Sequence, residues 1–288
     1  MRKPDFFIVG QTRSGTNSLQ FQLEQHPEIF ISKNTKTIFG FKKQINSEKE
    51  YLNQFTKIKQ KIIGERNTDY LVCSTSAEKI KKFNPNAKII MILRNPIDVM
   101  YSVHSTALSR GIDENIQDFE TALDEQENRK IDEEKNPGKY SPFVFYYDVG
   151  KYSIQVKRYI ENFEPKNILI IKFEEFIENP HSQFKNICDF LDINSDFIPT
   201  IKKMNQYRTV RNQKLKKIAD LAPKNAIGQK MIKSKTVKRI YSKINRPAFT
   251  REKLKISVRD KIIQEIKTDI DDLSKSVKMD FSYWYKSY

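Results

Sequence analysis

The sequence has few residues of the kinds that build disulfide frameworks or metal sites. Of its 288 residues, two are cysteine and three are histidine. Cys73 and Cys188 are too few for a disulfide framework or a zinc site, and we interpret them as reduced, buried thiols. His26, His104 and His181 are scattered along the chain, which argues against a histidine-based metal site.

Glycine, proline and long apolar runs are also scarce. Eight glycines and eleven prolines exclude a fibrous or low-complexity protein. No run of about 18 apolar residues is present, so no segment is predicted to span a membrane. A buried strand is predicted to begin by about residue 6, which leaves no room for a signal peptide. We therefore expect a cytoplasmic protein, with peripheral contact to an anionic membrane as an extension of that expectation.

The sequence has an excess of basic over acidic residues. The formal net charge is +16, and hydrophobic residues make up 38% of the chain, enough for a sizeable core. Residues 202–243 hold fourteen basic residues and one acidic residue, whereas residues 112–134 hold ten acidic and two basic residues. The excess predicts an anionic partner, and a phosphorylated cofactor, an acidic glycan, a membrane surface and nucleic acid all fit it.

Short apolar runs alternate with helical patterns along most of the chain. This alternation predicts an α/β fold with a central parallel sheet flanked by helices, in which ligands bind at the carboxyl ends of the strands. The predicted strands cover residues 5–10, 61–65, 87–93 and 167–173, and the predicted helices cover residues 18–25, 48–60, 75–82, 96–108, 149–163 and 181–191.

The first chemical motif is the stretch FFIVGQTRSGTNSL, residues 6–19. Gly10 and Gly15 have the spacing of a phosphate-binding loop, but Thr16 stands where such a loop carries lysine, and the cation is Arg13. Backbone N–H groups, the hydroxyls of this loop and the positive end of the following helix together predict an anion cradle. An ordinary Gly/Ser turn with a capping hydroxyl is the alternative.

The second motif, RNPIDVMYSVHS, begins where the clearest core strand ends. A triphosphate-hydrolysing site would place a magnesium-binding carboxylate near that point, but the residue is Arg94. Arg94 and Ser102, about two helical turns further on, can hold one phosphate from two sides. This pattern predicts a site that neutralises charge without a metal. The alternative is an arginine paired with a surface carboxylate and an incidental serine.

Together the two motifs resemble those of the sulfotransferases that use 3′-phosphoadenosine 5′-phosphosulfate (PAPS), in the bacterial and carbohydrate-type branch. RSGTNSL (13–19) resembles the loop that holds the phosphosulfate, and residues 94–102 resemble the motif that holds the 3′-phosphate. Further similar stretches, in the family's order, are LEQHPEIF (23–30), IGERNTDYL (63–71), residues 150–192 and residues 266–284. The resemblance implies a single P-loop-NTPase-like sulfotransferase domain over residues 1–288.

The resemblance also implies roles for individual residues. Arg13 would stabilise the charge that develops on the oxygen bridging phosphate and sulfate. NQYRTVRNQKL (205–215) resembles the basic loop that closes over the cofactor, so the 202–243 arm would take that role; residues 112–148 would be an acceptor-side insertion and residues 250–288 a C-terminal helical segment. The implied cofactor-binding residues are Arg13, Ser14, Gly15, Thr16, Asn17, Ser18, Arg94, Ser102, Arg208 and Arg211.

The sequence offers several candidates for the catalytic base. Carbohydrate-type members carry a glutamate shortly after the His-Pro motif, whereas KNTKTIFGF (33–41) offers Asn34 or Thr37. Glu65 is our first substitute, and the alternative is that Glu65 orients the phosphate loop or binds Arg66 or Arg13. A second substitute is His104, with a buried structural role as its alternative, and an acidic residue of 112–134 is a third.

The predicted reaction is transfer of a sulfuryl group from PAPS to a hydroxyl or amine of a carbohydrate or glycolipid, by metal-free in-line displacement. The alternatives are a catalytically impaired nucleotide-binding relative and a P-loop-like small-molecule kinase. A nucleic-acid binder is disfavoured, because the basic stretch lacks the interleaved aromatic residues that stack on bases.

Overall fold

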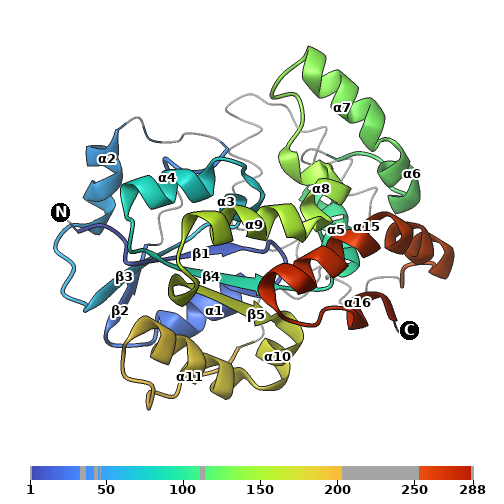
Figure 1. Cartoon of the computed structure of the whole chain (residues 1–288). Helices are drawn as coiled ribbons and strands as arrows, with labels where there is room; N and C mark the ends of the chain where they lie inside the picture. The colour runs from blue at the N-terminus through green and yellow to red at the C-terminus, as the bar shows by residue number, and fades with distance from the viewer. Residues whose placement is uncertain are drawn as a thin grey trace, which may run out of the picture.

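The computed structural model describes residues 2–32, 37–41, 45, 47–110, 114–202 and 253–286. Five parallel strands form one sheet in the order β2-β3-β1-β4-β5 (Figure 1). This arrangement confirms the predicted parallel sheet. The strands are β1 (Phe6–Gly10), β2 (Ile29–Ile31), β3 (Ile62–Arg66), β4 (Lys88–Leu93) and β5 (Ile168–Lys172).

Helices connect consecutive strands and cover both faces of the sheet. Those between β1 and β4 are α1 (Thr16–Leu23), α2 (Glu48–Leu52), α3 (Asp69–Val72) and α4 (Ser76–Phe83). Those between β4 and β5 are α5 (Pro96–Arg110), α6 (Phe119–Asp124), α7 (Gln126–Lys135), α8 (Tyr146–Gly150) and α9 (Tyr152–Asn162). After β5 come α10 (Phe173–Glu178), α11 (Pro180–Leu191), α15 (Ile256–Val277) and α16 (Tyr283–Lys286), and none of the helices described here is long and apolar enough to cross a membrane.

The alternation of side chains along each strand divides the core into two clusters. Phe7 and Val9 of β1 belong to the cluster that also contains residues of α4, α9 and α15. Phe6 and Ile8 belong to the other cluster, with residues of α1 and α11. Figure 1 shows α4 and α9 on one side of the sheet and α1 and α11 on the other. Both faces of β1 and β4 are therefore buried, as the continuous apolar runs of these strands predict.

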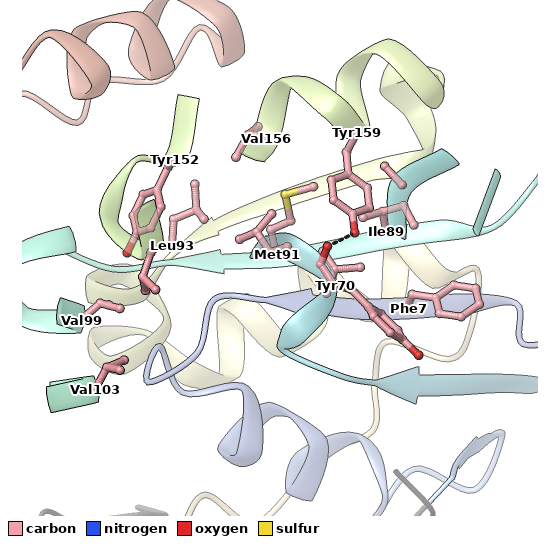
Figure 2. Close-up of a cluster of buried hydrophobic side chains, with 14 of the residues drawn as sticks. Phe7, Tyr70, Ile89, Met91, Leu93, Val99, Val103, Tyr152, Val156 and Tyr159 are labelled. Carbon is pink, nitrogen blue, oxygen red and sulfur yellow. Dashed lines mark hydrogen bonds between the residues drawn. The ribbon is translucent and has the colours of Figure 1, made fainter. Parts of the chain in front are cut away.

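The first cluster connects α9 to the centre of the sheet (Figure 2). Tyr152, Val156 and Tyr159 of α9 lie over Leu93, Met91 and Ile89 of β4. Tyr159 also donates a hydrogen bond of 2.8 Å to the carbonyl oxygen of Tyr70 in α3. Helix α9 is therefore fixed to the sheet by apolar packing and to α3 by a buried hydrogen bond.

The pairing of β1 with β4 determines where the loop after β1 begins. Ile8 lies opposite Ile90, but the register then shifts, so that Gly10 lies opposite Met91. Beyond the strand, Gln11 N donates to Ile92 O at 2.9 Å. The loop therefore begins beside the last residues of β4, close to Arg94.

Several predicted boundaries were wrong for local reasons. The helix predicted over 48–60 ends at Leu52 and continues only as a 3₁₀ turn to Phe55, because Thr56 is extended and Lys57 is left-handed with φ of 58°. The helix predicted over 149–163 is broken at Lys151, whose ψ of 92° separates α8 from α9. The strand predicted over 167–173 ends at Lys172, since Phe173 already begins α10.

Two of the smallest elements were not predicted. Strand β2 has only three residues, too few for a period-two pattern to stand out. Helix α3 has only four residues, too few for a helical repeat. In contrast, the expected C-terminal helix is present as α15, and the expected helical insertion is present as α6 and α7.

Candidate functional site

The Gly-rich loop joins the carboxyl end of β1 to the N-terminus of α1. Two of its residues have left-handed backbone conformations, Arg13 with φ of 63° and Gly15 with φ of 83°. Gly15 is the N-cap of α1, and no side chain caps the helix. The loop thus turns sharply and leaves the first N–H groups of the helix open.

Among the residues that the structure describes, the N–H groups of Gly15, Thr16 and Asn17 have no hydrogen-bond acceptor. Unpaired N–H groups at a helix N-terminus, together with the helix dipole, form a ready anion site. The loop therefore has the geometry expected for an anion cradle, and the hydroxyl cap named in the alternative is not formed.

The serine and threonine side chains of the loop differ in their surroundings. Ser14 is fully buried, its N–H donates to Gln11 O at 3.2 Å, and its hydroxyl lies 3.5 Å from Thr12 O. Ser14 therefore stabilises the loop through contacts with the loop's own backbone. Thr16 is buried at the start of α1, while Asn17 and Ser18 are half-buried.

The two sequence motifs meet at Arg13. Its Nε donates a hydrogen bond of 2.9 Å to Ser102 Oγ, which lies on α5. Arg94 Nη1 donates to the carbonyl oxygen of Arg13 at 3.3 Å. The structure thus brings Arg13, Arg94 and Ser102 together, as expected of segments that hold the two ends of one ligand.

Arg94 has a carboxylate partner as well. Its Nη2 lies 3.2 Å from Asp98 Oδ2, one turn along α5, and its side chain is 24% exposed. The ion pair proposed as the alternative to phosphate binding is therefore formed, but within the same motif. Because the Arg94 side chain stays partly accessible, Asp98 orients it without burying it.

Phe173 is a site residue that the sequence motifs did not assign. The Arg94 guanidinium carbon lies 4.7 Å from the centre of the Phe173 ring. A Cβ on Gly15 would lie 3.2 Å from the same ring. Phe173 thus packs against both the loop and Arg94. The sequence did contain a signal, because KFEEF (172–176) matches a motif of the resembled family to which no role was given.

Glu65 lies away from this cluster. It is paired with Phe7 in the sheet, three residues before Gly10, and it is 2% exposed. Its two carboxylate oxygens accept hydrogen bonds from the hydroxyls of Tyr51 and Tyr70. Burial raises the pKa of Glu65 to about 7, although the two tyrosine hydrogen bonds act in the opposite direction. No open face of this carboxylate is therefore presented to an acceptor.

The contact between Glu65 and Arg66, one of the alternatives to a role as base, is not formed. The Nε of Arg66 instead donates to Gln20 of α1. On the other side, the hydroxyl of Tyr70 also contacts Thr37 Oγ1, which in turn accepts from Phe39 N at 3.0 Å. Glu65 is thus linked through Tyr70 to the described part of the segment in which the resembled family carries its base.

Two of the other candidate bases, His104 and Glu114, are engaged in the packing of the insertion. His104 is 2% exposed, its Nε2 lies 2.9 Å from Ile116 O, and burial lowers its pKa. Glu114 accepts two hydrogen bonds from Arg129, at 2.8 and 2.9 Å. The structure therefore places His104 and Glu114 where they fasten the insertion to α5 and α8.

Some predicted residues lie outside the described ranges. These are Asn34 and the two arginines assigned to the cofactor, Arg208 and Arg211, together with the rest of the basic arm from residue 203 onward. Within the ranges described above, no three histidine, cysteine, aspartate or glutamate side chains gather as a metal-binding group.

Comparison with known proteins connects this geometry to one family. Residues 3–269 match the family described as "Sulfotransferase domain". Two curated relatives from Homo sapiens are carbohydrate sulfotransferase 15, 23% identical over 66% of this chain, and bifunctional heparan sulfate N-deacetylase/N-sulfotransferase 2, 23% identical over 67% of it. The matched parts cover 44% and 22% of these relatives, so the chain spans less than half of their length.

A solved structure supports the fold over the whole chain. A sulfotransferase from Alicyclobacillus acidocaldarius aligns with a TM-score of 0.75 at 23% identity, covering 99% of this chain and 100% of the other. At this identity the likeness concerns the fold, and it confirms the predicted sheet flanked by helices.

Proposed function

The chain belongs to the sulfotransferase family, and we propose that it transfers a sulfuryl group from PAPS to a hydroxyl or amine of an acceptor. The observation that carries this proposal is the meeting of Arg13, Arg94 and Ser102 beside the open N–H groups of α1. Two cations that follow the adjacent strands β1 and β4 suit a ligand with an anionic group at each end.

The chemistry of the described residues fits such a ligand. The N–H groups of Gly15, Thr16 and Asn17 offer donors for one phosphate group, and Arg94 with Ser102 offers donors for a second. Phe173 adds an aromatic wall beside both segments. Hydroxyl, amide and guanidinium donors of this kind need no metal to hold phosphate groups.

In the proposed reaction PAPS supplies an activated sulfuryl group, whose departure leaves negative charge on the oxygen of the 5′-phosphate. Arg13 is the residue that stabilises this charge, because its guanidinium belongs to the loop that holds the phosphate. Ser102 orients Arg13 through the hydrogen bond to Nε. Since this contribution matters most as the bond breaks, loss of Arg13 is expected to lower kcat more than ligand affinity.

We propose that Glu65 is the group that finally takes up the proton lost by the acceptor, although Glu65 does not contact the acceptor itself. A pKa of about 7 suits a general base near neutral pH. Because both carboxylate oxygens accept tyrosine hydroxyls, the proton would arrive through Tyr70, which also contacts Thr37. The support for this role is the linkage from Glu65 to the 37–41 segment.

We propose a carbohydrate as the acceptor, with a glycolipid as the narrower possibility. The two curated relatives are named for sulfation of carbohydrate and of heparan sulfate, and the second name specifies an N-sulfotransferase. The net charge of +16 favours an acidic acceptor or one presented at an anionic surface.

A catalytically impaired nucleotide-binding relative is the second candidate, because Glu65 is buried. Calorimetry with 3′-phosphoadenosine 5′-phosphate (PAP), the desulfated product, against ATP with magnesium tests the cofactor first. Micromolar binding of PAP that is lost in Arg94→Ala would support the proposal, and a preference for magnesium-ATP would favour a kinase. PAP binding without turnover on a panel of carbohydrates would favour the impaired relative.

A further inference from the structure

The N-terminal part of α9 contacts the first residue of each proposed anion-binding segment. These segments are the Gly-rich loop, which follows β1, and the stretch that begins at Arg94, after β4. Tyr152 donates from its hydroxyl to the carbonyl oxygen of Arg94 at 3.0 Å. One turn later, Gln155 Oε1 accepts from Gln11 Nε2 at 3.3 Å. Residues three apart lie on the same face of a helix, so one helix face holds the start of both segments.

Gln11 is the connection on the side of the Gly-rich loop. Its side chain is fully buried, and its Oε1 accepts from Thr12 N at 2.6 Å, inside the loop. Its Nε2 also donates to Val149 O of α8 at 3.0 Å. The amide group of Gln11 thus joins the backbone of the loop to the junction of α8 and α9.

The junction itself is held on several sides. Gln155 Nε2 donates to Asp148 O at 2.7 Å, which closes the turn between α8 and α9. Asp269 of α15 accepts from Ser153 N at 3.2 Å and so caps the first turn of α9. The ring of Tyr152 lies 5.9 Å from that of Trp284. Since Tyr152 and Gln155 are 0% and 1% exposed, their contacts are shielded from water.

We propose that Tyr152 and Gln155 are positioning residues. Together they hold the stretch that begins at Arg94 and the Gly-rich loop at the separation that a ligand with two phosphate groups requires. This inference rests on the proposed function for the identity of the ligand. The physical reason is preorganisation: a ligand that bridges two segments binds tightly only when their spacing is already fixed. A ligand with one phosphate is insensitive to that spacing.

The two tyrosines of α9 provide a matched pair of variants. Tyr152 and Tyr159 are both fully buried, and each donates its hydroxyl to a backbone carbonyl, of Arg94 and of Tyr70 respectively. Figure 2 shows them on the same helix, with Tyr152 beside Leu93 and Tyr159 beside Ile89. Tyr152→Phe and Tyr159→Phe therefore remove equivalent hydrogen bonds, but only the first lies beside the segments proposed to bind the two phosphate groups.

The test compares the affinities of PAP and of adenosine 5′-monophosphate by calorimetry. In Tyr152→Phe, PAP affinity is expected to fall about fivefold or more, as for the loss of roughly one hydrogen bond, while affinity for the monophosphate stays the same. In Gln155→Leu, PAP affinity is expected to fall more than affinity for the monophosphate. In Tyr159→Phe both affinities are expected to match the wild type. Equal losses for the two ligands, or equal losses in Tyr152→Phe and Tyr159→Phe, would overturn the proposal.

Hydrogen exchange on the unliganded full chain gives a readout that needs no ligand. Tyr152→Phe is expected to speed exchange at residues 94–98, and Gln155→Leu at residues 11–16, with Tyr159→Phe affecting neither. Unchanged exchange at both places would overturn the positioning role. If the wild type bound PAP no better than the monophosphate, the proposed function would fail, and the exchange result would still decide whether α9 holds the two segments.

Discussion

Arg13 and Ser102 are joined by a hydrogen bond of 2.9 Å from Nε to Oγ, although they come from motifs 89 residues apart. The contact with Ser102 uses the Nε of the Arg13 guanidinium. Arg13 thus belongs to the loop, but Ser102 of the second motif orients its side chain. The two motifs form a common site in which a change to one alters the other.

Arg13→Met is expected to lower kcat by about 10²–10³, the loss seen when a donor to a developing oxyanion is removed. PAP affinity should change much less, because the N–H groups at the start of α1 remain. Ser102→Ala should give a smaller fall in kcat, since it removes the orienting partner of Arg13 and keeps the charge. Steady-state kinetics together with calorimetry measure both quantities. A loss of PAP affinity as large as the loss of kcat in Arg13→Met would contradict this role.

Gly15→Ala is expected to destabilise the loop and to weaken PAP binding. A side chain at φ of 83° costs about 1 kcal/mol of folding free energy, and its Cβ would press on Phe173 at 3.2 Å. Gly138→Ala is a matched control, because Gly138 has φ of 86° but no atom within 4 Å of the added Cβ. Urea unfolding and calorimetry should show a backbone cost in both variants and a loss of PAP binding only in Gly15→Ala. Equal behaviour in both assays would rule out a role for the contact with Phe173.

The sequence predicted which residues meet at the loop better than it predicted the surroundings of Glu65. Arg13, Arg94 and Ser102 were identified because spacing along the chain, at the ends of neighbouring parallel strands, fixes where such residues meet. Glu65 lies on the expected strand, but whether its carboxylate is free depends on Tyr51 and Tyr70, which come from two separate helices. Residue spacing within one strand carries no information on such contacts.

The same limit explains why Phe173 and Gln11 received no role from sequence. Each follows a strand and has no distinctive spacing of its own, and each contacts a partner that is distant in the chain. Helix α9 was predicted from its apolar repeat, but its break from α8 at Lys151 follows from how Gln155 closes the turn. Long-range polar contacts therefore set the details that periodicity leaves open.

Glu65→Gln is expected to change how stability depends on pH. Burial raises the pKa of Glu65 from 4.5 to about 7, so the folded protein holds this proton more tightly than the unfolded chain. The stability contributed by the neutral carboxyl is fully present below pH 4.5 and is lost as pH rises through about 7. Glutamine stays neutral throughout, so the variant should gain up to about 3 kcal/mol relative to the wild type over that range.

Urea unfolding at several pH values measures this difference, and parallel curves for the two proteins would contradict it. Glu65→Gln also distinguishes a role of Glu65 as catalytic base from a purely structural role. Retained turnover on a true acceptor would remove Glu65 from the reaction. Loss of turnover in both Glu65→Gln and Tyr70→Phe, with PAP affinity preserved, would support transfer of the proton through Tyr70.

Arg129→Met is expected to destabilise the insertion strongly. Arg129 and Glu114 form a buried pair, with side chains 7% and 0% exposed, and Tyr146 also donates to Glu114 at 2.5 Å. Removing one partner leaves a buried charge, which costs about 3–5 kcal/mol. The double variant Arg129→Met with Glu114→Gln should recover part of this loss. Thermal unfolding of the three proteins measures it, and a double variant less stable than Arg129→Met would exclude charge burial as the cause.

The arrangement of the strands also has a consequence for how the chain folds. β1 and β4 pair in parallel although Ile8 and its partner Ile90 are far apart in sequence, and α9, which holds both segments, comes later still. The complete site therefore does not exist until contacts between distant parts of the chain have formed, which are the slow contacts in folding. A nucleotide that requires the complete site would then bind only after the folding transition state, slowing unfolding while leaving the folding rate unchanged.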